Sequence, residues 1–154
     1  PRRVQGLGRG VNRIPRRTRS KGSPIYEART RDIVVRVMCS YRPEDSEPDI
    51  GLHMWSYVVE IENHGTETVQ LISRHWIITD SRNNVDEVKG EGVVGDQPVL
   101  KPREAYRYTS GCPLRTASGS MHGSFQMLTD HGETFDAEIP PFSLDLPDAR
   151  KVMN

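Results

Sequence analysis

Apolar and polar residues alternate along most of this chain, and alternation with a period of two predicts β-strands. An apolar residue or a cysteine occupies every second position from residue 33 to residue 41, as expected for a strand with one buried face. The same pattern returns from Trp55 to Ile61, where polar residues fill most of the intervening positions. Further strands are predicted over residues 105–110, 120–129, 133–139 and 142–146.

Residues 68–79 depart from this alternation because apolar side chains fall on both predicted faces. Leu71 and Ile77 share one face of an ideal strand, whereas Ile72, Trp76 and Ile78 share the other. Strands that are covered on both sides show such patterns. The segment is therefore predicted to be a central strand, buried on both faces.

Clusters of turn-forming residues separate these segments, notably over 42–49, 63–66, 80–84 and 130–133. No stretch shows the spacing of apolar residues that an amphipathic helix requires. Short strands that recur every 8–12 residues are typical of sandwiches. The chain is predicted to be all-β, an antiparallel β-sandwich of about seven or eight strands.

Length and charge divide the chain into a body and two ends. Its 154 residues suit one domain, predicted over 24–148, with a short tail over 149–154. Residues 1–23 carry eight basic side chains and no acidic one, and they are predicted to be a disordered leader. The leader is either merely flexible, which we favour, or an arm that grips nucleic acid. The remaining residues hold 13 basic and 21 acidic side chains, so nucleic acid is not expected to bind the body.

Cysteine content and hydropathy predict a cytoplasmic protein that does not enter a membrane. Cys39 and Cys112 are the two cysteines, and they form no pattern of a disulfide framework. No apolar run approaches the length of a membrane span, and no signal-peptide core stands near residue 1.

Gly90, Gly92 and Gly95 form a GxGxxG pattern, which binds phosphate when it joins a strand to a helix. Pro98 and Pro102 follow closely and exclude an ordinary helix after these glycines. We therefore favour glycines that permit positive φ angles in a β-connection. The alternative is an unusual anion site, for which nearby cations are available: Lys89, Lys101, Arg103 and Arg107.

Other chemically active residues point more to structure than to catalysis. Arg74 either satisfies a buried carboxylate, the preferred interpretation, or contacts a partner. Ser110 and Cys112 lack the neighbours of a nucleophile. The five histidines show no chelating spacing, and the acidic residues of 44–49 are better explained as a solvated loop than as a Mg²⁺ site. No catalytic residue, metal site or cofactor is predicted.

Five motifs occur in order along the chain: 73–76 (SRHW), 90–98 (GEGVVGDQP), 108–111 (YTSG), 121–127 (MHGSFQM) and 139–144 (IPPFSL). Together they resemble the ApaG family, from about Tyr26 to Leu146. The resemblance implies a fibronectin type III-like β-sandwich, and it supplies no catalytic residues. Arg103 stands where this family commonly has a turn glycine.

The resemblance also implies two alternative functions. Related domains in eukaryotic F-box proteins and in a polymerase-interacting protein look like protein-interaction modules, so a non-enzymatic module with an unidentified protein partner is expected. In bacteria the family is associated with cobalt and magnesium resistance and with a neighbouring diadenosine tetraphosphate hydrolase. The alternative is a regulatory protein that binds pyrophosphate or a dinucleotide through the Gly90–Gly95 loop.

Overall fold

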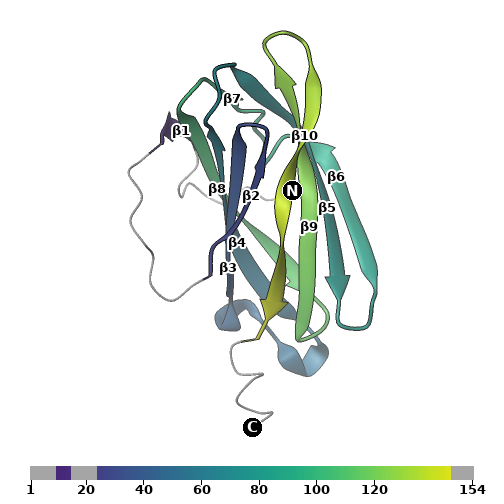
Figure 1. The fold of residues 1–154 in the computed structure, drawn as a ribbon. Helices are drawn as coiled ribbons and strands as arrows, with labels where there is room; N and C mark the ends of the chain where they lie inside the picture. The colour runs from purple at the N-terminus through teal and green to yellow at the C-terminus, as the bar shows by residue number, and fades with distance from the viewer. Residues whose placement is uncertain (1–9, 15–23, 147–154) are drawn as a thin grey trace.

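Two antiparallel sheets pack face to face in the computed structural model, which describes residues 10–14 and 24–146 (Figure 1). The first sheet has the order β1 (Gly10–Arg13), β8 (Glu104–Leu114), β4 (His53–Asn63), β3 (Ile33–Tyr41), β2 (Tyr26–Thr30). The second has the order β10 (Thr134–Asp145), β9 (Ser118–Thr129), β5 (Val69–Asp80), β6 (Val85–Glu91), and the short β7 (Val99–Leu100) also pairs with β5. The predicted β-sandwich is confirmed.

Aromatic side chains from both sheets meet in the core. The ring of Trp76 on β5 lies 5.2 Å from that of Tyr57 on β4, and 6.1 Å from that of Phe142 on β10. Phe142 also approaches Tyr26 on β2, with 5.8 Å between the ring centroids. These large rings, three of them buried and Tyr26 partly buried, join the two layers, because each aromatic side chain removes much apolar surface from water.

The two-sided pattern predicted for residues 68–79 is wrong, because β5 contains a β-bulge. Leu71 pairs with Met127, but Ser73 pairs with the adjacent Gln126, so one extra residue of β5 is accommodated at Ile72. A bulge shifts the alternation by one position. Leu71 and Trp76 therefore share the inner face and are both buried, whereas Ile72 and Ile77 are only half-buried. The strand is central in its sheet but is covered on one face.

Strand boundaries also differ from the prediction at two places. The strands predicted over 133–139 and 142–146 form one strand, β10, whose register with β9 shifts between Ile139 and Phe142. Pro140 and Pro141 occupy this irregularity, where β10 is an edge strand and a missing N–H is tolerated. β8 is longer than the predicted segment of 105–110.

Part of the predicted disordered leader is ordered. Gly10–Arg13 forms β1, which pairs with β8 from Gly10 opposite Arg107 to Arg13 opposite Glu104. Backbone pairing at a sheet edge does not require apolar side chains, so composition alone did not indicate this strand. Residues 1–9 and 15–23 of the leader and the tail at 149–154 lie outside the described residues.

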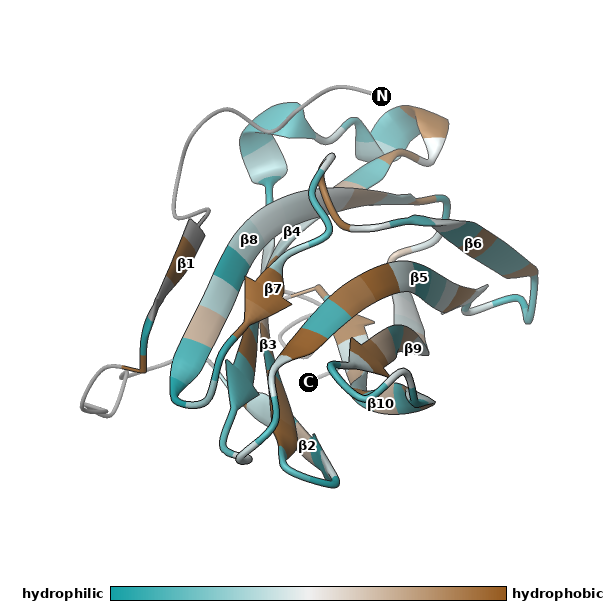
Figure 2. Ribbon diagram, turned by 90° about the horizontal axis from the view of Figure 1, so that it is seen from above, coloured by the Kyte–Doolittle hydropathy of each residue, from teal (hydrophilic) through white to brown (hydrophobic). Residues whose placement is uncertain are grey.

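Seen from above, β6 lies at the outer margin of its sheet, away from the strands of the first sheet (Figure 2). Two 3₁₀ helices, η1 (Pro43–Asp45) and η2 (Pro48–Ile50), occupy the predicted polar loop before β4. Across residues 10–14 and 24–146, no helix is long and apolar enough to cross a membrane.

Candidate functional site at the β6 edge and the glycine hairpin

The bulge in β5 directs Arg74 toward the motif glycines. After the bulge, Arg74 pairs with Gly90 of β6 on one side and with the buried Phe125 of β9 on the other. Its Nη1 donates hydrogen bonds of 3.0 Å to the main-chain carbonyls of Glu91 and Gly92. The guanidinium therefore binds backbone oxygens, and the interpretation that Arg74 satisfies a buried carboxylate is wrong.

Gly90 and Gly92 are required sterically by this arrangement. A Cβ atom at Gly90 would lie 2.8 Å from Nη1 of Arg74, so the absent side chain makes room for the guanidinium. Gly92 has a φ of +62°, and a Cβ atom there would lie 2.2 Å from the carbonyl oxygen of Asp96. Both glycines thus permit close approach of other groups.

The motif continues as a tight turn, and we call residues 90–97 the glycine hairpin. The amide of Val93 donates to the Asp96 carbonyl and that of Asp96 donates to the Val93 carbonyl, each over 2.8 Å. Val94 and Gly95 between them have positive φ angles, which is the geometry of a type I′ turn. Positive φ angles in a β-connection, the favoured interpretation of the glycines, are confirmed at Gly92 and Gly95.

Several hydrogen bonds attach the glycine hairpin to the rest of the sandwich. The Gly92 amide donates to the carbonyl of Ile72, which also accepts a bond from the Gln97 side chain. The Tyr106 hydroxyl donates to Asp96 over 2.9 Å. With Val93 and Asp96, three amide groups of the hairpin are therefore used within the chain, and a phosphate could not recruit them without breaking these bonds.

The cations proposed to assist an anion site do not converge on the glycine hairpin. Lys89 stands on β6 opposite His75. Lys101 instead follows Leu100, which pairs with Val69 at the start of β5. Six positions of strand separate the two levels, or roughly 20 Å. The structure brings Arg74 against Gly90 and Gly92, whereas Lys89 lies on the opposite face of β6 and Lys101 and Arg103 lie elsewhere.

β6 offers an unpaired backbone edge beside the glycine hairpin. It pairs with β5 on one side, and no described strand pairs with it on the other. The hydrogen bonds from Asp80 N to Asn84 O and from Gly92 N to Ile72 O show which residues of β6 are bonded to β5. Antiparallel bonding alternates, so the outward N–H and C=O groups belong to Val85, Glu87, Lys89 and Glu91. The Glu91 carbonyl already accepts a hydrogen bond from Arg74, so the open part of the edge runs from Val85 to Lys89.

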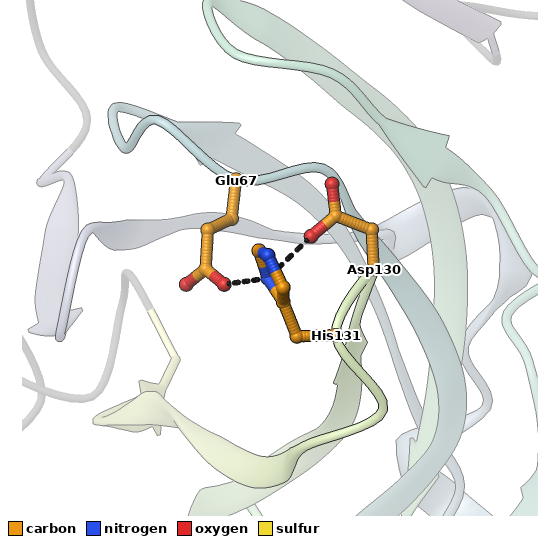
Figure 3. A group of neighbouring side chains, drawn as sticks. All are labelled: Glu67, Asp130 and His131. Carbon is orange, nitrogen blue, oxygen red and sulfur yellow. Dashed lines mark hydrogen bonds and ion pairs between the residues drawn. The ribbon is translucent and has the colours of Figure 1, made fainter.

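A second group of polar side chains lies at the end of the sandwich where β5 begins. His131 Nδ1 is 2.6 Å from Glu67 Oε2 and 2.9 Å from Asp130 Oδ1 (Figure 3). The two loops meet because Val69 pairs with Thr129. The sequence placed His131 in a turn, but only the strand register reveals its carboxylate neighbours.

These three side chains could hold a cation, since their ligand atoms lie within 4.8 Å of one another. However, both carboxylates approach the same imidazole nitrogen, Nδ1 of His131. This is the arrangement of one N–H group that donates to two carboxylates. Hydrogen bonding to Glu67 and the charge of Asp130 raise the pKa of His131. Arg31 also forms an ion pair with Glu67 over 3.7 Å, which partly neutralises the Glu67 carboxylate.

Cys112 lacks the properties of a nucleophile. It is 3% exposed, and burial raises the pKa of its thiol to about 11. A thiol with this pKa is protonated at neutral pH, and the thiolate is the reactive form. The sequence-based assignment of Cys112 to structure agrees with this environment.

By its fold the chain is a β-sandwich of two antiparallel sheets. The ApaG domain model matches residues 43–129. Protein ApaG of Caulobacter vibrioides is 63% identical over 139 residues, covering 90% of this chain and 99% of the relative. Protein ApaG of Xanthobacter autotrophicus is 54% identical, covering 84% of this chain and the whole relative. The chain belongs to the ApaG family.

A solved structure supports this assignment. The putative ApaA protein from Bordetella pertussis has a TM-score of 0.74 and 46% sequence identity to this chain. The alignment covers 75% of this chain and 94% of the Bordetella protein. The family resemblance predicted from the five motifs is thereby confirmed.

Proposed function

We propose that this ApaG-family chain is a non-enzymatic protein-interaction module that binds an extended segment of a partner protein along β6. The unpaired outer edge of β6 is the observation that carries the proposal. An exposed strand edge presents N–H and C=O groups in the spacing that an added strand requires. Six of its seven residues are exposed, and the glycine hairpin holds one end of the strand in place.

The side chains of β6 indicate the chemistry of the partner segment. Val85 is 58% exposed and Val88 is 39% exposed, so each face of the strand presents one apolar side chain. Three carboxylates, Asp86, Glu87 and Glu91, outnumber the single cation of this strand. A partner strand with alternating apolar and basic residues would match this edge, because opposite charges directly across a strand pair stabilise it.

Two features favour binding over catalysis. The thiol of Cys112 is protonated at neutral pH, as its raised pKa indicates. His131 is bonded to two carboxylates at an exposed loop, so its Nδ1 atom is already engaged (Figure 3). A protein partner and the absence of enzymatic activity are therefore parts of the same proposal.

Substitution at Glu87 tests the backbone contact directly. Proline at Glu87 removes one outward N–H group and leaves the ladder to β5 intact, because the inward bonds belong to the neighbouring residues. Glu87→Ala is the matched control, since both variants lose the ion pair to His75 but only proline removes the donor. Wild type, Glu87→Ala and Glu87→Pro serve as baits, and each recovered protein is then produced and titrated with amide-exchange detection.

The proposal requires a partner that binds wild type and Glu87→Ala, loses at least about tenfold in affinity for Glu87→Pro, and protects residues 85–91 from exchange. Loss of one strand hydrogen bond together with a clash accounts for such a change. Equal binding by Glu87→Pro, or protection confined to other strands, would contradict it. Self-association that Glu87→Pro abolishes would instead make a second copy the occupant and overturn the proposal of a separate partner.

A further inference from the structure

An open pocket of about 660 Å³ lies at the end of the sandwich where β4 ends and β8 begins. Its lining includes Arg13, His64, Thr66 and Arg103, together with apolar atoms of Pro102. This volume falls within the range of small-molecule sites. The pocket is distinct from the β6 edge, and Arg103 is one of the cations that the structure separates from the glycine hairpin.

Backbone bonds hold the three segments of the pocket together. The amide of Ile14, directly after β1, donates to the carbonyl of Arg103 over 3.0 Å. The amide of Arg103 donates in turn to the carbonyl of Asn63 over 2.9 Å. The short β1 therefore places Ile14 against Arg103 and Arg13 opposite Glu104, and both arginines line the pocket. The turn after Asn63 places His64 and Thr66 on the same pocket.

The lining formed by described residues carries positive charge without a carboxylate. Neither Arg13 nor Arg103 forms an ion pair with a carboxylate within residues 10–14 and 24–146. Behind the pocket, His64 Nε2 lies 2.9 Å from the carboxylate of Glu62, which is 2% exposed. Arg36 pairs with the same carboxylate at 2.5 Å, so the buried negative charge is already balanced.

Two further carboxylates lie on the adjoining smaller pocket, which shares Gly65 and Thr66 with the first. Asp32 is paired with Arg29 at 3.1 Å, and Glu67 is 3.7 Å from Arg31. Arg31 is shared with Glu133, from which it lies 3.2 Å, and Glu67 also bonds His131, so both carboxylates of the smaller pocket are already engaged. The two arginines of the larger pocket remain available to an incoming anion.

We propose that this pocket binds a phosphate-bearing anion, with the guanidinium groups of Arg13 and Arg103 as its principal donors. Guanidinium groups bind phosphate oxygens through paired, charge-assisted hydrogen bonds. The hydroxyl of Thr66 and the ring of His64 supply further polar contacts at the rim. The pocket has room for more than one phosphate group. This site is independent of partner binding on β6, so either can fail without the other.

Titration of the full ¹⁵N-labelled chain with inorganic pyrophosphate and, separately, with ATP tests the proposal. Saturable amide shift changes should centre on residues 13–14 and 64–66 and on Arg103. Tighter binding of ATP would assign the site to a nucleotide, whereas equal binding would assign it to the phosphate groups alone. Shift changes centred on residues 90–95, or none at millimolar concentrations of both probes, would overturn it.

Charge-removing variants distinguish this site from general attraction to cations. Arg13→Gln and Arg103→Gln should each weaken pyrophosphate binding about tenfold, because each removes one charge-assisted contact. Lys89→Gln is the matched control, since it removes the same charge beside the glycine hairpin and should leave the affinity unchanged. Amide spectra of each variant show whether the fold is retained. Equal weakening by all three variants would contradict a defined site.

Discussion

At the scale of single residues, Gly92 combines a positive φ angle with a backbone atom too close to admit a side chain. Gly92→Ala places a Cβ atom against a backbone oxygen of Asp96 and also imposes a positive φ angle on alanine. Backbone cannot move aside as a flexible side chain can, so we expect the free energy of unfolding to fall by about 3 kcal/mol. Urea denaturation followed by circular dichroism measures the change.

Gly132 provides the matched control for that substitution. Its φ of +83° imposes a similar backbone penalty on alanine, but no atom lies within 4 Å of the added Cβ. Gly132→Ala should therefore lower the free energy of unfolding by only about 1 kcal/mol. Equal losses in the two variants would show that the contact with Asp96 contributes nothing.

His131 is the residue whose protonation should depend most visibly on its neighbours. Its pKa is raised, first by the hydrogen bond to Glu67 and then by the charge of Asp130. A raised folded pKa stabilises the fold at a pH below the unfolded value of about 6.5, and this stabilisation disappears as pH rises through the folded pKa. An NMR titration should give a pKa for His131 above 6.5, and Glu67→Gln should lower it.

The control for this titration is Glu138→Gln, which removes an exposed carboxylate of β10 that is not among the causes of the shift. It should leave the His131 pKa in place. The wild-type shift should also shrink in high salt, because the imidazole is exposed. A pKa that Glu67→Gln does not change would contradict the hydrogen-bonded arrangement of Figure 3.

At the scale of elements, the bulge in β5 determines what the glycine hairpin is attached to. It turns Arg74 inward, where the guanidinium binds the carbonyls of Glu91 and Gly92. Arg74→Ala leaves both carbonyls without this donor, so the free energy of unfolding should fall by about 1–3 kcal/mol. Hydrogen exchange of residues 90–97 should accelerate more than that of β9.

Arg82→Ala is the comparison for Arg74→Ala, because Arg82 is an exposed arginine in the turn between β5 and β6. It should change the free energy of unfolding by less than about 0.5 kcal/mol. If Arg74→Ala leaves exchange over 90–97 at the wild-type rate, the hydrogen bonds to Glu91 and Gly92 do not hold the hairpin.

The same bulge shows where prediction from the sequence ends. The alternation of apolar and polar residues identified β3 and β4 because these two strands pair without any shift of register, from Ile33 to Tyr41 of β3. It misassigned β5 because a single unpaired residue near Ile72 reverses every later side chain, and no local residue type marks that position. Composition likewise missed β1, whose pairing depends on the free edge of β8 and not on its own side chains.

At the scale of the whole molecule, prediction of a site fails for a related reason. The motif glycines and Arg74 could be selected from the sequence because they occur as compact segments. His131 and Glu67 are 64 residues apart, and only the pairing of β5 with β9 brings them within 2.6 Å. Predicting a surface that is assembled from separate loops therefore requires the register of the strands, which the alternation of apolar and polar residues does not provide.

The two sheets should unfold as one unit because their shared core passes through Phe142. This side chain is 3% exposed and approaches aromatic rings of β2, β4 and β5. Phe142→Ala should lower the free energy of unfolding by about 3–5 kcal/mol. Ile50→Ala, at a position that is 73% exposed, should change it by less than about 0.5 kcal/mol.

Coincidence of two optical probes tests the cooperative part of this prediction. Trp55 and Trp76 are both buried and lie in different sheets, so tryptophan fluorescence reports on both layers, while far-ultraviolet circular dichroism reports on the strands. The two signals should give the same urea midpoint in wild type and should shift together in Phe142→Ala. Separate midpoints would mean that one sheet survives the loss of the other, which a core shared through Phe142 does not allow.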